Sequence, residues 1–113
     1  TVEIDSTIAE EANQNFSTHG TNAFIIIGDG VKIVHDLAEK KQKFDMIFID
    51  FFKKGYLQVL EPCISLVKEG GYIIADNISF ENCQDFKQAI LNHPKLTTEI
   101  IDIKDGMSIS MKK

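Results

Sequence analysis

Apolar residues are distributed along this chain in short continuous runs separated by stripes at helical spacing. One continuous run, Phe24–Ile27, is typical of a strand buried on both faces of a parallel sheet. A similar run at Met46–Ile49 and strand-like segments at Val2–Ile4 and Tyr72–Ala75 follow the same pattern. The sequence therefore predicts four strands, each of which ends at a glycine or a polar residue.

Each predicted strand is followed by a segment with helical periodicity. Apolar residues recur at this spacing within residues 8–16, 31–37, 56–67 and 86–91. Pro62 is expected to bend or break the third helix, and Gly70–Gly71 is expected to turn the chain. Asp105–Gly106 favours a hairpin between strands at Thr97–Ile103 and Met107–Met111. These elements predict an α/β fold, with helices on both faces of a mostly parallel sheet and a C-terminal antiparallel hairpin.

Composition narrows the class of protein. A chain of 113 residues fits a single domain over residues 1–113, and the net charge of −5 argues against a general nucleic-acid binder. Cys63 and Cys83 form neither a disulfide framework nor a zinc-ligand spacing. No apolar run approaches the roughly 18 residues of a membrane span, and no signal peptide is recognisable. A cytoplasmic location without membrane attachment is the expectation.

Acidic and amide side chains follow the ends of the predicted strands, where ligands bind in open α/β sheets. Asp50, Asp76 and Asn77 supply hard oxygen donors from two of these ends. Such a set suits Mg²⁺ or Ca²⁺. In the alternative interpretation, Asp76 caps the next helix and Asn77 hydrogen-bonds a loop.

Lys53 stands three residues after Asp50, and next to a divalent cation its neutral amine would be favoured, as a general base requires. The alternative is a solvated lysine beside Lys54.

Taken together, several motifs resemble those of the cation-dependent O-methyltransferases of the catechol and caffeoyl-coenzyme A type. These enzymes are class I methyltransferases with a Rossmann-like fold that use S-adenosylmethionine. The most specific resemblance combines the Asp-x-x-Lys-x-x-Tyr run over residues 50–56 with Gly70–Gly71 and the following Asp76–Asn77. Weaker matches lie at residues 2–5, 28–30 and 105–106, so the resemblance covers essentially the whole chain.

The resemblance implies a set of cofactor contacts. Glu3 would accept hydrogen bonds from the ribose hydroxyls of S-adenosylmethionine. Asp29 and Gly30 would line the adenine, and Phe52 would pack on its face. Asp50 would also border the cofactor.

The resemblance also implies a reaction. Asp50, Asp76 and Asn77 would hold a divalent cation that orients and acidifies a hydroxyl of the acceptor. Lys53 would take the proton of that hydroxyl, and Tyr56 would support the site. The acceptor is expected to be a small-molecule hydroxyl, with a hydroxyuridine of transfer RNA as the alternative. A homodimer is the expected assembly.

Two departures from the family pattern carry expectations of their own. The family's first strand and glycine-rich loop should precede Thr1, so these residues are expected to be the C-terminal part of a longer enzyme and to bind the cofactor poorly alone. An apolar gap is expected where that strand would lie. The segment Ile78–Asn82 is short, which implies an open acceptor site. Two other classes remain open: a phosphoacceptor receiver domain using Asp50, and a non-catalytic remnant of the methyltransferase fold.

Overall fold

The computed structural model describes residues 1–113 and divides them into two compact units, Thr1–Ile33 and Val34–Lys113. The boundary falls inside helix α2, Gly30–Glu39. Whether the two units form the single domain expected from the sequence stays a prediction. None of the α-helices combines the length and the hydropathy that a bilayer-spanning segment needs.

The first unit contains a short parallel pair of strands and one helix. Strand β1, Val2–Glu3, pairs with β2, Ile26–Ile27, and helix α1, Ser6–Thr18, connects them. Phe24 is 81% exposed and the two residues of β2 are also exposed. The expectation of a strand buried on both faces is therefore wrong here, because β2 pairs with β1 alone and no layer within the unit covers it.

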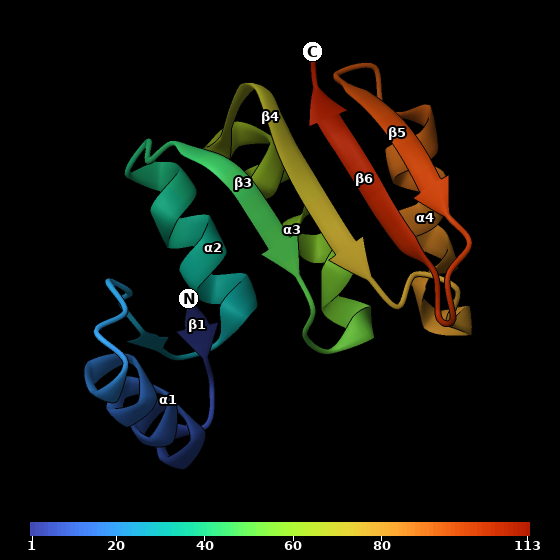
Figure 1. Ribbon diagram of the computed structural model, residues 1–113. Helices are drawn as coiled ribbons and strands as arrows, with labels where there is room; N and C mark the ends of the chain where they lie inside the picture. Colours follow the sequence, from blue (N-terminus) through green and yellow to red (C-terminus); the bar gives the residue numbers. More distant parts are fainter. The chain divides into compact units, whose positions relative to one another are not determined.

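The second unit is a four-stranded sheet in the order β3-β4-β6-β5 (Figure 1). Only β3 and β4 are parallel, so the sheet is mixed rather than mostly parallel, and β5 and β6 form the predicted C-terminal hairpin. The α/β fold class and the predicted order of elements are confirmed. The bounds are β3 Phe44–Ile49, the 3₁₀ turn η1 Lys53–Gly55, α3 Tyr56–Leu66, β4 Val67–Asp76, the 3₁₀ turn η2 Glu81–Cys83, α4 Gln84–Asn92, β5 Leu96–Ile101 and β6 Met107–Lys112.

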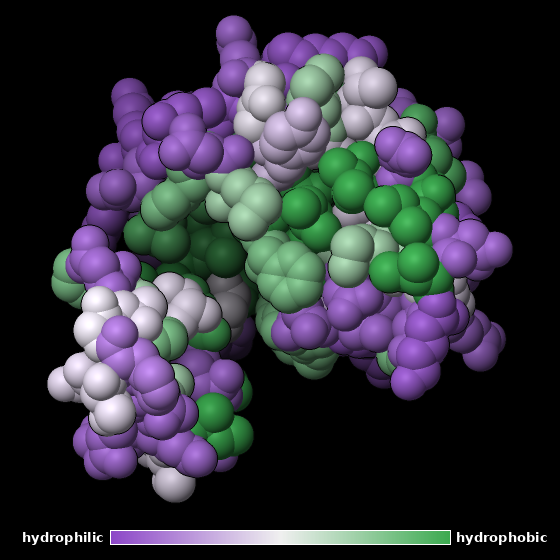
Figure 2. Space-filling view, viewed as in Figure 1, coloured by the Kyte–Doolittle hydropathy of each residue, from purple (hydrophilic) through white to green (hydrophobic).

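The two faces of this sheet differ. Helices α3 and α4 lie against one face, where Ile73 and Ala75 of β4 are fully buried (Figure 1). The opposite face carries Tyr72 of β4 at 43% exposure, with Met46 and Phe48 of β3 at 57% and 54%. Apolar side chains gather over β4 and β6 on this face (Figure 2). Within the second unit, strand β3 also has no partner on its outer edge. The apolar gap expected from the sequence stays a prediction.

Helix α3 continues through Pro62 to Leu66, so of the two predicted effects of this proline, a bend or a break, the break is wrong and the bend stays a prediction. Proline has no backbone N–H, and the carbonyl of Gln58, four residues earlier, loses its donor within the helix. Nε2 of His35, on α2, lies 3.3 Å from that carbonyl oxygen. The imidazole therefore replaces the missing intrahelical donor, which explains how the helix accommodates proline.

Gly70–Gly71 lies within β4 instead of separating it from the helix. The register jumps from Phe44↔Val67 to Met46↔Tyr72, so four residues of β4 bulge out of the ladder. Gly70 has φ +79, and a Cβ on Gly71 would lie 2.6 Å from the Asp45 carbonyl oxygen. The two glycines therefore do turn the chain, but within a strand that continues on both sides.

Strand β6 is fixed to the end of α3 by Lys112. Its Nζ donates to the carbonyl oxygens of Ile64 at 2.8 Å and Val67 at 3.1 Å. The last carbonyls of a helix have no intrahelical donor, so this amine satisfies groups that would otherwise lack a partner. The contact joins the C-terminal strand to the helix that precedes β4.

Candidate active site

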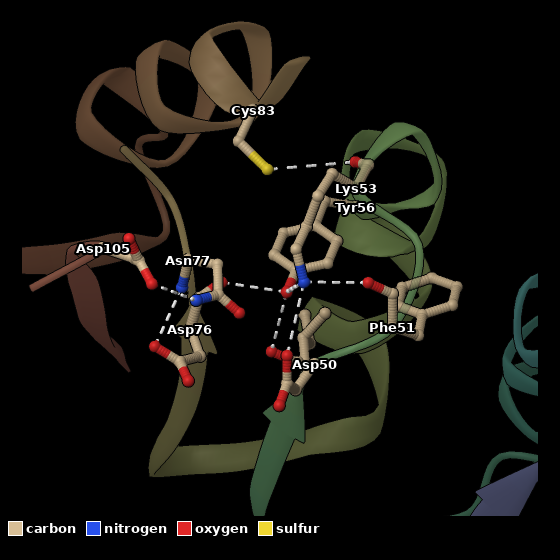
Figure 3. Close-up of polar contacts among 9 residues, drawn as sticks. Asp50, Phe51, Lys53, Tyr56, Asp76, Asn77, Cys83 and Asp105 are labelled. Atoms are coloured by element: carbon tan, nitrogen blue, oxygen red, sulfur yellow. Dashed lines mark hydrogen bonds and ion pairs between the residues drawn. The ribbon is translucent and has the colours of Figure 1, made fainter. Parts of the chain in front are cut away.

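The parallel register of β3 and β4 brings Asp50 and Asp76 to one edge of the sheet. Ile49 pairs with Ala75; Asp50 directly follows β3, and Asp76 is the last residue of β4. Neighbouring strands lie about 4.8 Å apart, so the carboxylates leave the sheet side by side (Figure 3). Asn77 follows with φ +61, a left-handed conformation that asparagine adopts more readily than most residues. The three predicted cation ligands are therefore neighbours.

These residues fit a hard cation in their donor chemistry. The Asp50 side chain is 44% exposed, and Asp76 and Asn77 are half-buried, so their oxygens are accessible to a ligand. No cluster of three or more histidine, cysteine, aspartate or glutamate side chains is placed to hold a metal ion. A cation at this edge would therefore depend on the amide oxygen of Asn77 in addition to two carboxylates. Water or substrate oxygens would complete its coordination.

Lys53 is not a solvated lysine. Its side chain is only 16% exposed, and Nζ donates to Oδ1 of Asp50 at 3.3 Å, the carbonyl oxygen of Phe51 at 2.9 Å and the hydroxyl of Tyr56 at 3.1 Å (Figure 3). Burial alone lowers the pKa of the Lys53 amine, but Tyr56 and Asp50 outweigh this effect and leave that pKa raised. The three acceptors hold an ammonium ion. The general-base role, which needs the neutral amine, stays a prediction.

Tyr56 connects the ends of the two parallel strands. Its side chain is completely buried, with the ring stacked on Phe51 at a centroid distance of 5.7 Å and edge-on to Phe86 at 5.4 Å. The hydroxyl lies 2.9 Å from the carbonyl oxygen of Asp76 and 3.3 Å from that of Ile49, and it donates its proton to this pair. Burial raises the pKa of Tyr56. The side chain therefore holds the strand ends and accepts the bond from the lysine.

The predicted cofactor residues are divided between the two units. In the first unit, Glu3 ends β1 and accepts a bond from the Asp5 N–H through one carboxylate oxygen, at 3.2 Å. Asp29 follows β2 and accepts from the N–H of Val31 at 3.0 Å, and Gly30 begins α2. In the second unit, Phe52 is 56% exposed. Their roles toward a cofactor stay predictions.

One neighbour of the site escaped the sequence analysis. The Nδ2 atom of Asn77 lies 3.4 Å from Oδ2 of Asp105, at the tip of the β5–β6 hairpin. From the sequence, Asp105 is interpreted as part of a turn and of a weak family match, with no role at the site. The pairing of Asp76 with Met107 places the β5–β6 turn at the same edge of the sheet. The sequence carried no signal for this placement, because the register of an antiparallel pair is not readable from the sequence alone.

A model of the O-methyltransferase family matches residues 1–113, and the chain belongs to that family.

Individual relatives agree with this assignment. A candidate caffeoyl-CoA O-methyltransferase of Arabidopsis thaliana is 27% identical over an alignment of 103 residues, and the match covers 74% of this chain and 44% of the relative. A candidate caffeoyl-CoA O-methyltransferase of Staphylococcus aureus superposes with a TM-score of 0.87 at 26% identity, over the whole of this chain and 63% of that one. An O-methyltransferase of Bacillus cereus, solved with SAH, has a TM-score of 0.91 at 21% identity, over 100% and 61%. The chain thus spans about half to two-thirds of these relatives' length.

Proposed function

We propose that the polar residues at the ends of β3 and β4 form the part of an active site that binds the cation and the methyl acceptor. The enzyme would be an S-adenosylmethionine-dependent O-methyltransferase that methylates a hydroxyl of a small molecule. The observation that carries the proposal is the side-by-side placement of Asp50 and Asp76 at the strand ends, with the Lys53 amine bonded to Asp50. Membership of the O-methyltransferase family and the structural likeness to an enzyme solved with SAH support it.

In this proposal, a divalent cation would be held by Asp50, Asp76 and Asn77. Lys53 would accept the proton of the acceptor hydroxyl, and Tyr56 would position Lys53. When bound, S-adenosylmethionine would supply a transferable methyl group on a sulfonium, and a divalent cation would lower the pKa of an acceptor hydroxyl. The Lys53 ammonium would first lose a proton to solvent, which a positive charge nearby favours, and the neutral amine would then receive the proton of that hydroxyl. Because the tyrosine hydroxyl is anchored on the strand ends, the amine is held in place for this transfer.

The proposed contacts of S-adenosylmethionine are with Glu3, Asp29, Gly30 and Phe52. Glu3 suits the ribose, because its carboxylate can only accept hydrogen bonds and one of its two oxygens has no partner within the chain. Phe52 suits the adenine, because an exposed aromatic ring offers a flat apolar surface for a base.

A small acceptor is favoured over transfer RNA by charge. The net charge of −5 gives the protein no general attraction to a phosphate backbone. The short connection between β4 and η2 leaves room for a larger acceptor, so the alternative has a direct test. Retention of labelled transfer RNA by the protein at about 100 mM salt would favour the RNA acceptor.

The cation site is tested by titrating Mn²⁺ into residues 1–113 and following the free ion by electron paramagnetic resonance. We expect D50N to weaken Mn²⁺ binding by about 10-fold or more, since a charged ligand is lost. The matched control is D45N, because Asp45 lies on the same strand with an 89% exposed carboxylate paired with Lys68 at 3.0 Å. D45N should change the affinity less than about twofold, since its charge is screened by solvent. Equal effects of the two variants would contradict the site.

The cofactor assignment is tested by calorimetric titration of S-adenosylhomocysteine into residues 1–113 and into a protein of the relatives' full length. E3Q should lower the affinity for S-adenosylhomocysteine by about 10-fold and leave Mn²⁺ binding unchanged, because Glu3 contributes hydrogen bonds to the ribose only. Absence of binding by both proteins would refute the methyltransferase function.

A further inference from the structure

The tip of the β5–β6 hairpin is bonded to the loop that carries Asn77. The N–H of Ser79 donates to the carbonyl oxygen of Asp105 at 3.0 Å, and the N–H of Ile78 donates to that of Gly106 at 3.3 Å. Gly106 has φ +78, and a Cβ at this position would collide with the hydroxyl of Ser79. The hairpin tip and the loop therefore fit each other closely and fix each other's position.

The carboxylate of Asp105 has one polar contact within the chain, the amide nitrogen of Asn77 at 3.4 Å. It takes part in none of the chain's salt bridges, although it is half-buried. Strand β6 places it there, because Met107 pairs with Asp76 and the two residues before Met107 reach the strand ends. A half-buried carboxylate whose one polar partner is a candidate cation ligand therefore requires an explanation.

The chemistry of the pair selects one orientation of the amide. A carboxylate only accepts hydrogen bonds, whereas a primary amide has one donating and one accepting end. Asp105 therefore attracts the nitrogen of Asn77, and the oxygen must point the other way. In Figure 3 the nitrogen of Asn77 is on the side of Asp105, and the amide oxygen is on the side of Asp50. An amide presented in the opposite sense would offer a donor, which cannot bind a cation.

We propose that Asp105 is a positioning residue that orients the Asn77 amide so that its oxygen is available to the cation. This inference rests on the proposed cation site. A plainer interpretation assigns Asn77 only to its left-handed backbone conformation and Asp105 only to the hairpin turn. That interpretation predicts no effect of the Asp105 side chain on cation affinity.

The experiment measures Mn²⁺ affinity by electron paramagnetic resonance in residues 1–113 carrying D105N, D105A, N77G or both D105N and N77G. Glycine keeps the left-handed backbone at residue 77 and removes only the ligand. The matched control is D102N, because Asp102 is an exposed acid in the same β5–β6 connection. Melting temperatures without the cation verify that each variant folds, and D105A serves if D105N does not.

We expect D105N and D105A to weaken Mn²⁺ binding by about 10-fold, in the range found for residues that orient metal ligands. D102N should change it less than twofold, and D105N should add nothing to N77G, because no amide remains to be oriented. An unchanged affinity in both Asp105 variants, or an equal loss in the N77G background, would overturn the inference. If the unaltered protein bound no Mn²⁺, the proposed cation site itself would fail.

Discussion

The hydroxyl of Tyr56 offers a direct test of how the candidate site is held together. Y56F removes one oxygen atom from a fully buried side chain and leaves the aromatic packing on Phe51 and Phe86 in place. That oxygen donates to the carbonyl of Asp76 and accepts from the ammonium of Lys53. The variant therefore isolates the hydrogen bonds from the ring.

The expected cost follows from these two bonds. A hydrogen bond between neutral groups contributes about 1 kcal/mol to stability, and one to a charged group about 1.5–3 kcal/mol. The Lys53 amine keeps two other acceptors and is 16% exposed, so its share belongs at the lower end. We expect a loss of about 2–3 kcal/mol in the free energy of unfolding. For a domain of this size, that loss lowers the melting temperature by roughly 8–12 °C.

Urea unfolding followed by circular dichroism at 222 nm measures this change. Alkylation of Cys63, which is 1% exposed, reports specifically on the second unit. The matched control is Y72F, because Tyr72 lies on β4 at 43% exposure and its hydroxyl has no partner within the chain. Y72F should stay within about 0.5 kcal/mol of the unaltered protein. A Y56F variant as stable as Y72F would show that the hydroxyl does not hold the strand ends, and the reasoning would be refuted.

Three further predictions concern the second unit. H35A should lower the free energy of unfolding by about 0.5–1 kcal/mol, because it removes the imidazole from the Gln58 carbonyl. In a P62A background the loss should be smaller, because alanine restores the missing intrahelical N–H. A double-mutant cycle in urea measures the difference. Burial raises the pKa of the Cys63 thiol to about 12, above the ordinary value of 9, so the free energy of unfolding should fall as pH rises from about 9 to 12. C63A should make that fall shallower, as urea titrations at several pH values would show. K112M should cost about 1–2 kcal/mol by removing two hydrogen bonds, whereas K113M should cost almost nothing, as thermal melts would show.

The order of strands and helices was predictable from the sequence because it depends on local patterns. Apolar runs predicted β3 and the second part of β4, helical stripes predicted α1 to α4, and the Asp105–Gly106 turn predicted the final hairpin. The positions of Asp50 and Asp76 at the ends of strands also followed from these runs, because ligands of open α/β sheets gather at that edge. Periodicity reports the average environment of each side chain, and this is sufficient for element type.

Local patterns failed where neighbours supply or withhold a partner. Pro62 stays inside α3 because His35, 27 residues before it in the sequence, supplies a donor. Met46 is exposed because no layer within its unit covers that face of β3, and Phe24 is exposed because it precedes the short strand β2, although both runs are those of buried strands. Gly70–Gly71 bulges inside β4 because β3 continues to pair on both sides of it. In each position, the deciding atoms belong to a different element.

The sequence by itself determined that Asp50, Asp76 and Asn77 lie at strand ends, since strand ends and residue types are local properties, but it did not place Asp105 beside them. Only the tertiary structure decided how these side chains are arranged. The Lys53 ammonium is held by three acceptors, and the amide of Asn77 contacts a carboxylate 28 residues away. Hydrogen bonds depend on distance and direction, and these depend on the pairing of β4 with β6, which local residue patterns do not specify.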